Sequence, residues 1–466
     1  MSRVKVTLLT NQRRDSPEIH IGIDDTDSDK GGCTTYTATV LLQELSSRGF
    51  KPSDFPWLVR LNPNIPWKTR GNGALSVHFF IDEERVEDIQ RTALEIVEKT
   101  TVASDKGTDP AVVFLKGEVP RVLREYSTRA LHDVLTIREA RAVATRAGAQ
   151  IHALKGVRGV IGSIAAIGAG LDRVEHTFEI IAYRTRDHLG TQRLVDKESV
   201  RNMDIKHGST TFHNMDRETG RILVTPRGPD PVLLGIRGFD PRILLEALGE
   251  VKMKEPVERV MIFRTNQGTN AHLTRARKIS ELEPFQSAVL TARVDSLPRV
   301  LRGGHVIFRI RDETGVAVCA AYEPTGTLMR AARELFPGDK IQAYGGVRLN
   351  RDRSLTLNLE RLAILSVVEA SQEENPRCPD CGTCCESMGR DQGFRCEKCG
   401  LRTRDSKTHV RMKRDLTPSV KIPPPRSRRH LTRPEIASQN PGLTFVRKDP
   451  FSFERLLKAI QPASTL

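Results

Sequence analysis

Two Cys-x-x-Cys pairs constrain the fold of the C-terminal part of this chain more tightly than any other sequence feature. The pairs are Cys378–Cys381 and Cys396–Cys399, and the spacing between them is close to that of a zinc ribbon. Each pair turns two thiolates toward one ion, so that the two pairs complete a tetrahedron. We therefore expect a structural Zn²⁺ bound by Cys378, Cys381, Cys396 and Cys399. It has no catalytic role, because a closed four-thiolate site has no open position.

Two more cysteines, Cys384 and Cys385, lie between the pairs, and either could replace one of the four ligands or bind alone. The alternatives to zinc are a redox centre and an iron–sulfur cluster. A disulfide framework is not expected, because the chain is long, lacks a secretory signal, and has six of its eight cysteines within residues 378–399.

The charge of the chain indicates an anionic partner. The formal net charge is +15 and the pI is about 9.6, values typical of proteins that bind nucleic acid or an anionic surface. Aromatic residues make up only 5% of the chain, so base stacking cannot be widespread. We find neither a secretory signal nor an apolar run long enough to span a bilayer, and we therefore expect a cytoplasmic protein with no membrane partner.

The sequence pattern divides the chain into four segments. Residues 17–150 and 151–280 each mix strand and helix patterns, which predicts a multidomain α+β or α/β protein. Residues 284–367 have five strand patterns, with a helix after the third and a Pro-Gly-Asp turn before the fourth. This is the order of an OB-fold β-barrel, which commonly binds single-stranded nucleic acid; a generic small barrel is the alternative. Residues 376–430 hold the zinc ribbon and a basic, Pro-rich tail that we expect to be mobile in isolation.

Hydrophobic periodicity also predicts individual elements. We expect helices over residues 34–47, 83–100, 131–148 and 240–251, and strands over residues 19–23, 74–81, 111–117 and 257–265. Residues 222–238 are expected to form two strands around a Pro/Gly turn.

A run of acids follows the first predicted strand. Asp24 and Asp25 stand at the end of this strand, and Asp27 lies in the next loop. Ligands of α/β sheets usually bind at such strand ends. Gly31 and Gly32 then free the backbone to turn into the first predicted helix.

The start of that helix suggests what the acids bind. Free N–H groups at a helix N-terminus favour a phosphate, but carboxylates repel a phosphate unless a cation lies between them. Mg²⁺ satisfies both conditions, because it takes carboxylate oxygens on one side and phosphate oxygens on the other. The stretch therefore predicts a magnesium–nucleotide site, with Thr34 or Thr35 near the phosphates.

The acidic stretch has two other interpretations. A calcium loop is excluded, because Lys30 and Tyr36 occupy the positions where an EF-hand needs Gly and Glu, and a strand precedes the loop. Plain helix capping would account for one or two of these residues. It does not account for three acids and two glycines together.

Further loops could complete a nucleotide site. Lys106 and Gly107 lie in one loop, and Gly159 and Gly162 lie in a Gly-rich apolar segment for which close helix packing is the alternative. The polar loop 265–270 offers amides and hydroxyls to a base or an amine. Motifs of serine hydrolases, zinc proteases and protein kinases are absent, and the twelve histidines are scattered, so no histidine-centred site is expected.

Six features in this order resemble one known family. They are IGIDDTDS…GGCTTY, RGVIGSIAAIG, GPDPVLLGIRG and FRTNQGTNAHL, followed by the OB and four-cysteine segments. Over about residues 17–430 the chain resembles the archaeal tRNA 2-agmatinylcytidine synthetases. The resemblance implies a kinase-like N-terminal domain (17–150), a ferredoxin-like domain (151–280), an OB fold (284–367) and a zinc ribbon (376–430).

The resemblance also implies a reaction and its components. Members of the family join agmatine to carbon 2 of the wobble cytidine of an isoleucine tRNA and consume ATP. The expected cofactors are ATP, Mg²⁺ and Zn²⁺, and the expected partners are the tRNA and agmatine. Asp24, Asp25 and Asp27 match the acidic metal–ATP cluster of the family, and Thr34, rather than Thr35, matches the threonine that is phosphorylated.

The chain departs from the family pattern in three places. Residues 1–16 precede the usual start, Asn270 stands where an Asp is expected, and the tail after about residue 430 has no assigned role. Two rival functions remain open: a non-catalytic RNA-binding protein, and a small-molecule kinase with an RNA-binding appendage. Agmatine is a dication and needs an acidic or polar pocket, which the sequence alone does not locate.

Overall fold

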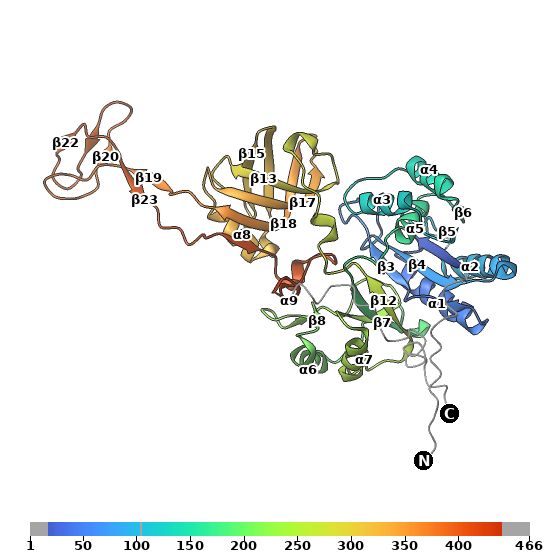
Figure 1. Ribbon diagram of the computed structural model, residues 1–466. Helices are drawn as coiled ribbons and strands as arrows, with labels where there is room; N and C mark the ends of the chain where they lie inside the picture. Colours follow the sequence, from blue (N-terminus) through green and yellow to red (C-terminus); the bar gives the residue numbers. More distant parts are fainter. Residues whose placement is uncertain (1–16, 103–104, 440–466) are drawn as a thin grey trace, which may run out of the picture.

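The computed structural model describes residues 17–102 and 105–439. Three parts follow one another: a ten-stranded sheet with helices on its faces, a β-barrel, and a small cysteine module. The barrel lies between the sheet and the module, which projects away from the rest of the molecule (Figure 1). The extension 1–16 and the tail after 439 lie outside the described residues. Among the described helices, none has the length and apolar content needed to cross a bilayer.

Strands from both of the first two predicted segments form the large sheet. Its order is β6-β5-β1-β4-β3-β12-β7-β11-β8, and β2 pairs with β4. The strands are β1 (Glu18–Asp24), β2 (Lys51–Pro52), β3 (Trp57–Arg60), β4 (Gly73–Phe80), β5 (Ala111–Lys116), β6 (Gln150–Ala153), β7 (Thr177–Arg184), β8 (Thr211–Phe212), β11 (Val232–Gly238) and β12 (Val257–Thr265). Both neighbours of β1 are antiparallel to it, so the sheet is mixed rather than parallel throughout.

One short parallel pairing joins the two halves of this sheet. Strand β12 meets β3 through Arg264 opposite Trp57 and Thr265 opposite Leu58. Just beyond β12, the Asn266 amide donates to the backbone oxygen of Arg60 at 2.9 Å and accepts from its N–H at 2.8 Å. The two halves therefore share one continuous sheet.

Helices cover both faces of the sheet. Ile19, Ile21 and Ile23 alternate along β1 and point to one face, where α1 and α2 bury them. On the other face α5 packs very closely: a Cβ on Gly22 would lie 2.2 Å from the backbone oxygen of Ser163. The helices are α1 (Thr34–Ser47), α2 (Val86–Thr100), α3 (Arg121–Ala130), α4 (Ile137–Ala147), α5 (Gly159–Ile167), α6 (Lys197–His207) and α7 (Pro241–Glu250).

Most of the predicted helices and strands are confirmed, but the bounds of one helix are wrong. The helix expected over residues 131–148 begins later, at Ile137, because α3 ends at Ala130 and α4 starts only after a capping box formed by Thr136 and Glu139. Strands lie on both sides of the predicted Pro/Gly turn in residues 222–238, although the first is short, and the two do not pair with each other. Instead β10 (Arg221–Ile222) pairs with β9 (Met215–Asp216), and β11 pairs with β7 and β8.

The third predicted segment is a closed five-stranded barrel. Its strands are β13 (Ser287–Val294), β15 (Val306–Asp312), β16 (Gly315–Ala321), β17 (Lys340–Leu349) and β18 (Leu355–Ser366), with β14 (Arg299–Val300) beside β15. Helix α8 (Thr327–Arg333) follows the third barrel strand, as the sequence predicts. The barrel closes through β13 with β15 and through the parallel pair β16–β18.

The cysteine module stands at the end of a two-stranded stalk. The stalk pairs β19 (Ser371–Glu374) with β23 (Thr408–Arg411), and the module holds β20 (Glu386–Ser387), β21 (Phe394–Arg395) and β22 (Arg402–Thr403). Figure 1 shows that the stalk carries the module away from both the barrel and the sheet.

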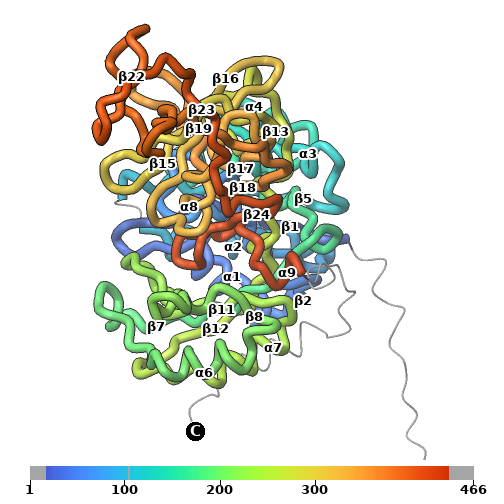
Figure 2. Tube along the Cα trace, turned by 90° about the vertical axis from the view of Figure 1, so that its left-hand side faces the viewer, coloured from blue at the N-terminus to red at the C-terminus, as the bar shows by residue number. Residues whose placement is uncertain are grey.

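After the stalk the chain returns to the body, in a segment that we call the strap (residues 419–439). Strand β24 (Ser419–Lys421) pairs with β18, and α9 (Glu435–Gln439) lies between the barrel and the sheet (Figures 1 and 2). The basic tail is expected to be mobile in isolation; within the whole chain this segment packs against the body. Its arginines meet buried acids, for example Arg426 with Asp216 at 2.9 Å.

Candidate active site and metal centre

The three predicted acids lie around one hollow at the end of β1. Asp24 ends the strand beneath α5, Asp25 has a φ of +60°, and Asp27 lies in the loop before α1. Thr34, the first residue of α1, shares this hollow. The lining residues are Asp24, Asp25, Asp27, Thr34, Leu61, Ile65, Trp67, Lys68, Thr69, Arg70, Asn72, Gly73, Ala130, Asp133, Val134, Leu135, Arg158, Ile161 and Gly162.

Asp27 and Thr34 hold the start of α1. The Asp27 carboxylate accepts from the Thr34 backbone N–H at 2.8 Å and from its hydroxyl at 3.0 Å. Cys33, the residue at the N-cap position, makes no side-chain capping bond, so Asp27 satisfies one of the free N–H groups of the first turn. The capping interpretation thus holds for Asp27 but leaves Asp24 and Asp25 unexplained.

Two arginines that the sequence analysis missed neutralise the acids. Arg158 donates through Nε to Asp25 at 2.7 Å. Arg70 lies 2.8 Å from Asp27 and 3.0 Å from Asp230, which comes from the second half of the sheet. Arg158 lies within the Gly-rich segment noted above, but no motif or spacing marks Arg70.

Burial shapes the electrostatics of this hollow. Burial raises the pKa of Asp24 well above its usual range, and the neighbouring Asp25 adds to the effect. Burial also raises the pKa of Asp25 to about 6, although Arg158 opposes the shift. A nearby cation favours the ionised form of such carboxyls. The hollow therefore suits a positively charged group more than a neutral one.

The acids do not form a ready-made metal cage. Among the described residues, the only set of three or more His, Cys, Asp or Glu ligand atoms within 4.8 Å of one another is the four-cysteine set. Mg²⁺ does not need such a cage, because it commonly binds one or two carboxylates and takes its other ligands from phosphates and water. The residues present fit a Mg²⁺ ion that arrives with a nucleotide.

The predicted glycines are mainly places of close backbone approach. A Cβ on Gly162 would lie 2.0 Å from the Asp24 carboxylate, and a Cβ on Gly159 would lie 2.9 Å from the Asp24 backbone oxygen. A Cβ on Gly32 would lie 2.5 Å from the Thr26 oxygen. Gly162 also lines the hollow. Such close approaches are what helix packing, the alternative to nucleotide binding, predicts for the glycines of residues 159–162.

The other predicted loop residues lie nearer the surface. Lys106 and Gly107 are exposed, and the Gly107 oxygen accepts from Arg158. Gly31 has a φ of +114°, a conformation that suits glycine and lets the loop turn toward α1.

A second hollow lies on the other side of Asp27, Thr34 and Arg70. It is bounded by the second half of the sheet and by the strap, and two buried carboxylates line it, Glu179 and Asp230. Its lining residues are Asp27, Cys33, Thr34, Thr35, Leu58, Arg60, Arg70, Gly71, Gly73, Glu179, Ile181, Leu223, Val224, Pro226, Asp230, Val232, Gly235, Arg237 and His430. The sequence analysis did not predict this hollow.

The polar loop 265–270 has a structural role. Asn266 joins β12 to β3, and the Gln267 amide donates to the Glu179 carboxylate. Asn270 has a φ of +59°, and its side chain accepts from the backbone N–H of Arg433 at 2.8 Å. Asn tolerates this left-handed conformation, so Asn270 serves here as a turn residue that holds the strap.

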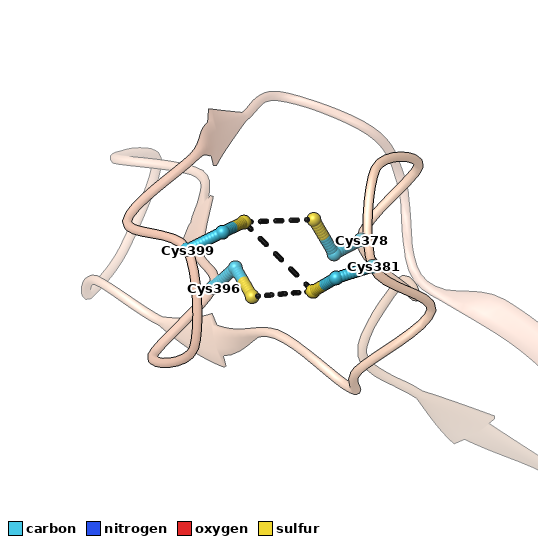
Figure 3. Close-up of side chains that lie close together, drawn as sticks. All are labelled: Cys378, Cys381, Cys396 and Cys399. Carbon is cyan, nitrogen blue, oxygen red and sulfur yellow. Dashed lines mark hydrogen bonds between the residues drawn. The ribbon is translucent and has the colours of Figure 1, made fainter.

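The four predicted cysteines converge within the module, where their side chains face one another (Figure 3). The Cys378 and Cys399 sulfurs lie 3.4 Å apart, as do those of Cys381 and Cys396. Thiolates at tetrahedral Zn–S distances of about 2.3 Å would lie about 3.8 Å from one another, so this set fits Zn²⁺.

Cys384 and Cys385 do not belong to this set. The sulfur of Cys384 lies 3.7 Å from the Asn375 oxygen, and that of Cys385 lies 4.0 Å from the Thr383 oxygen. The ambiguity in the ligand set is thereby resolved in favour of the two pairs.

A mixed sheet with an acidic hollow, a small barrel and a four-cysteine module together define a multidomain protein built to act on nucleic acid. Three family models match the chain: the TiaS TCKD domain at residues 20–156, the TiaS FLD domain at 157–272 and the TiaS C-terminal zinc ribbon domain at 375–416. The chain belongs to the TiaS family, the 2-agmatinylcytidine synthetases of an isoleucine tRNA, which confirms the resemblance seen in the sequence.

Curated relatives carry that family name. The enzyme of Thermococcus sibiricus is 41% identical over 419 residues, which cover 90% of this chain and 96% of the relative. That of Pyrococcus horikoshii is 41% identical over 418 residues, with coverages of 90% and 97%.

Solved structures of TiaS share the fold. The complex of TiaS with an isoleucine tRNA and ATP is 38% identical, with a TM-score of 0.79 over 90% of this chain and 97% of that one. The complex of TiaS with an isoleucine tRNA, AMPCPP and agmatine is 37% identical, with a TM-score of 0.77 and the same coverages.

Proposed function

We propose that this protein is an ATP-dependent ligase that joins agmatine to carbon 2 of the wobble cytidine of an isoleucine tRNA. The observation that carries the proposal is the hollow at the end of β1, where Asp24, Asp25, Asp27 and Thr34 meet. The family supports it, because TiaS has been solved with an isoleucine tRNA, an ATP analogue and agmatine together. Since its substrate is tRNA, the protein acts in the cytoplasm.

The chemistry has two steps. The oxygen on carbon 2 of cytosine is a poor leaving group, and transfer of a phosphoryl group from ATP converts it into a good one. The primary amine of agmatine then attacks carbon 2, and phosphate leaves with the oxygen. The protein has mainly to position the reactants and neutralise charge, as in other phosphoryl transfers.

Five residues of the first hollow have a role in this scheme. Asp24 and Asp25 would hold Mg²⁺ against the ATP phosphates, and Mg²⁺ supplies charge neutralisation there. The N-terminal turn of α1, beginning at Thr34, directs N–H groups at developing negative charge. Arg70 and Arg158 exchange their carboxylate partners for phosphate oxygens, which the guanidinium group binds equally well.

We place agmatine in the second hollow, which adjoins Thr34 and Asp27. Its buried carboxylates, Glu179 and Asp230, pair here with Arg237 and Arg70 at 3.0 Å each, and the dication would take the place of these partners. Exposed Trp67 at the mouth of the first hollow offers a stacking face to a nucleobase. The target cytosine must leave the anticodon stack to reach this point.

We assign the domains as kinase-like for residues 17–150, ferredoxin-like for 151–280, OB fold for 284–367 and zinc ribbon for 376–430. The matched family models and the strand order of the barrel support these bounds. The barrel and the ribbon then bind the tRNA, with the net charge of +15 favouring the contact.

The decisive experiment incubates the protein with ATP, agmatine and archaeal tRNA and measures agmatine-modified cytidine by nucleoside mass spectrometry. The variant Asp25→Asn removes one charge, and Asn tolerates the φ of +60° at this position. We expect it to lose on the order of 100-fold in rate while binding tRNA normally.

The matched control is Asp29→Asn, which removes the same charge from an exposed residue of the same loop and should retain activity. A wild-type protein that binds tRNA without modifying it would be the RNA-binding protein of the first alternative. Phosphorylation of a small molecule in the absence of tRNA would favour the kinase.

A further inference from the structure

The strap meets the barrel and residues from the second half of the sheet region within a few residues. Arg426 pairs with Asp216 of β9, in the two-stranded sheet between α6 and β11. Arg429 pairs with Glu360 of the barrel strand β18 at 2.9 Å. The backbone oxygen of His430 accepts from Gly268, which follows β12, at 3.0 Å.

Arg429 joins the strap to two other elements. Besides Glu360, its guanidinium donates to the Pro63 oxygen at 3.1 Å and to the Asn64 side chain at 3.2 Å, both in the loop after β3. Glu360 is buried and also lies 2.9 Å from His272. Glu360 therefore has two partners, Arg429 and His272. Separating Arg429 from this buried carboxylate is costly, because it would leave a buried charge without its compensating charge.

The next residue, His430, enters the second hollow. Its ring would lie 3.2 Å from a Cβ on Gly71, and it lines the hollow together with Thr34 and Glu179. Arg60, burial and Arg237 hold the pKa of His430 well below its usual value, so the imidazole is neutral at neutral pH. A neutral imidazole has one nitrogen free to accept a hydrogen bond.

We propose that the strap completes the catalytic hollow: Arg429 is a positioning residue that locks the barrel to the N-terminal half of the sheet, and His430 is a wall residue that contacts the amine substrate. This inference rests on the proposed function. The inference gives the strap, which follows the zinc ribbon in the chain, a role in the reaction. The zinc ribbon and the segment that lines the second hollow are therefore neighbours in sequence.

Substitutions of Arg429 and of His430 should change different kinetic constants. In Arg429→Met the barrel loses its anchor, so kcat should fall by about 10- to 100-fold because the reactants are misplaced, while the Kd for tRNA stays unchanged. Arg429→Lys keeps the charge but not the forked contacts, so it should recover only part of kcat. In His430→Ala the KM for agmatine should rise roughly tenfold, with a smaller effect on kcat.

The control is Arg433→Met, which removes the same charge from the same strap. The Arg433 side chain pairs with Glu175, so both kcat and the KM for agmatine should match those of the wild type. Folding is checked by the melting temperature and by zinc content. A variant that is poorly folded would lose activity whatever its role in the reaction. His430→Asn is therefore included as a second, smaller change at the same position of the second hollow.

The outcomes separate this inference from the proposed function. If the wild-type protein makes no agmatine-modified cytidine, the proposed function fails first. If the wild type is active and the Arg429 and His430 variants match Arg433→Met in kcat and KM, the strap is only a tether and the inference is wrong. An equal loss of tRNA binding in Arg429→Met, His430→Ala and Arg433→Met would also overturn the inference, because the strap would then serve to bind the RNA.

Discussion

The carboxylates of Asp24, Asp25 and Asp27, at the end of β1 and in the loop after it, are each held by different residues. Asp24 is covered by Gly162 of α5, Asp25 is paired with Arg158, and Asp27 is bound to Thr34 and Arg70. These restraints keep the acids around one hollow although their charges repel. The closeness of α5 matters most for Asp24, because any side chain at Gly162 would meet its carboxylate.

Gly162→Ala tests this closeness. The added Cβ would lie 2.0 Å from the Asp24 carboxylate, so we expect Asp24 to be displaced and the ligation rate to fall by about 100-fold. The control is Gly249→Ala in α7, where a Cβ meets no atom within 4 Å. That change should leave the rate unaltered and stabilise the protein by up to about 1 kcal/mol, measured by urea unfolding. Equal rates for both variants would show that Asp24 has no part in the reaction.

At the scale of elements, the ribbon and its stalk form a separate unit. The ribbon core contains Cys378, Cys385 and Cys396 with little other apolar surface, and the two strands of the stalk carry it away from the barrel (Figure 1). A module with so small a core depends on its metal for folding. Loss of zinc should therefore unfold the ribbon without unfolding the sheet.

Cys396→Ser should abolish zinc binding, measured by metal analysis, and weaken tRNA binding. Binding of ATP in the first hollow should persist, because the ribbon lies apart from the sheet. Cys384→Ser is the matched control, since the Cys384 sulfur faces the Asn375 oxygen and not the other four sulfurs. It should keep about one zinc per chain. Full tRNA affinity in zinc-free Cys396→Ser would refute a role for the ribbon in binding RNA.

At the scale of the whole molecule, the two halves of the sheet share a hydrophobic core, but the backbone pairing that joins them is short. The parallel pairing of β3 with β12 covers two residue pairs, and Asn266 extends it by bonding both backbone groups of Arg60. Both hollows lie close to this junction, because Arg70 from one half meets Asp230 from the other. The geometry of the site thus depends on how the halves are joined.

Asn266→Ala should weaken the junction. The backbone N–H and C=O of Arg60 would lose their partners, so the free energy of unfolding should fall by about 1–3 kcal/mol, measured by urea denaturation. Asn350→Ala, in an exposed hairpin where the amide bonds Ser354, should change it far less. An unchanged unfolding curve for Asn266→Ala would mean that this amide does not hold the halves together.

Local spacing explains why part of this structure could be predicted. The four zinc ligands, the acids before Thr34 and the strand order of the barrel each lie within a short stretch, where neighbours in sequence are neighbours in space. Predictions failed where a local pattern had two solutions. The break between α3 and α4 is one example, although its capping box of Thr136 and Glu139 was legible in the sequence.

By itself, the sequence determined which residues can bind a metal or a phosphate and which family the chain belongs to. Only the tertiary structure decided what surrounds them. Arg70 meets Asp230 across two halves of a sheet, and Arg429 meets Asn64 at a separation of 365 residues, so no local pattern records either contact. The basic tail looked mobile because its charges had no visible partners. Folding supplies those partners as buried carboxylates, and the tail becomes a strap that closes the site.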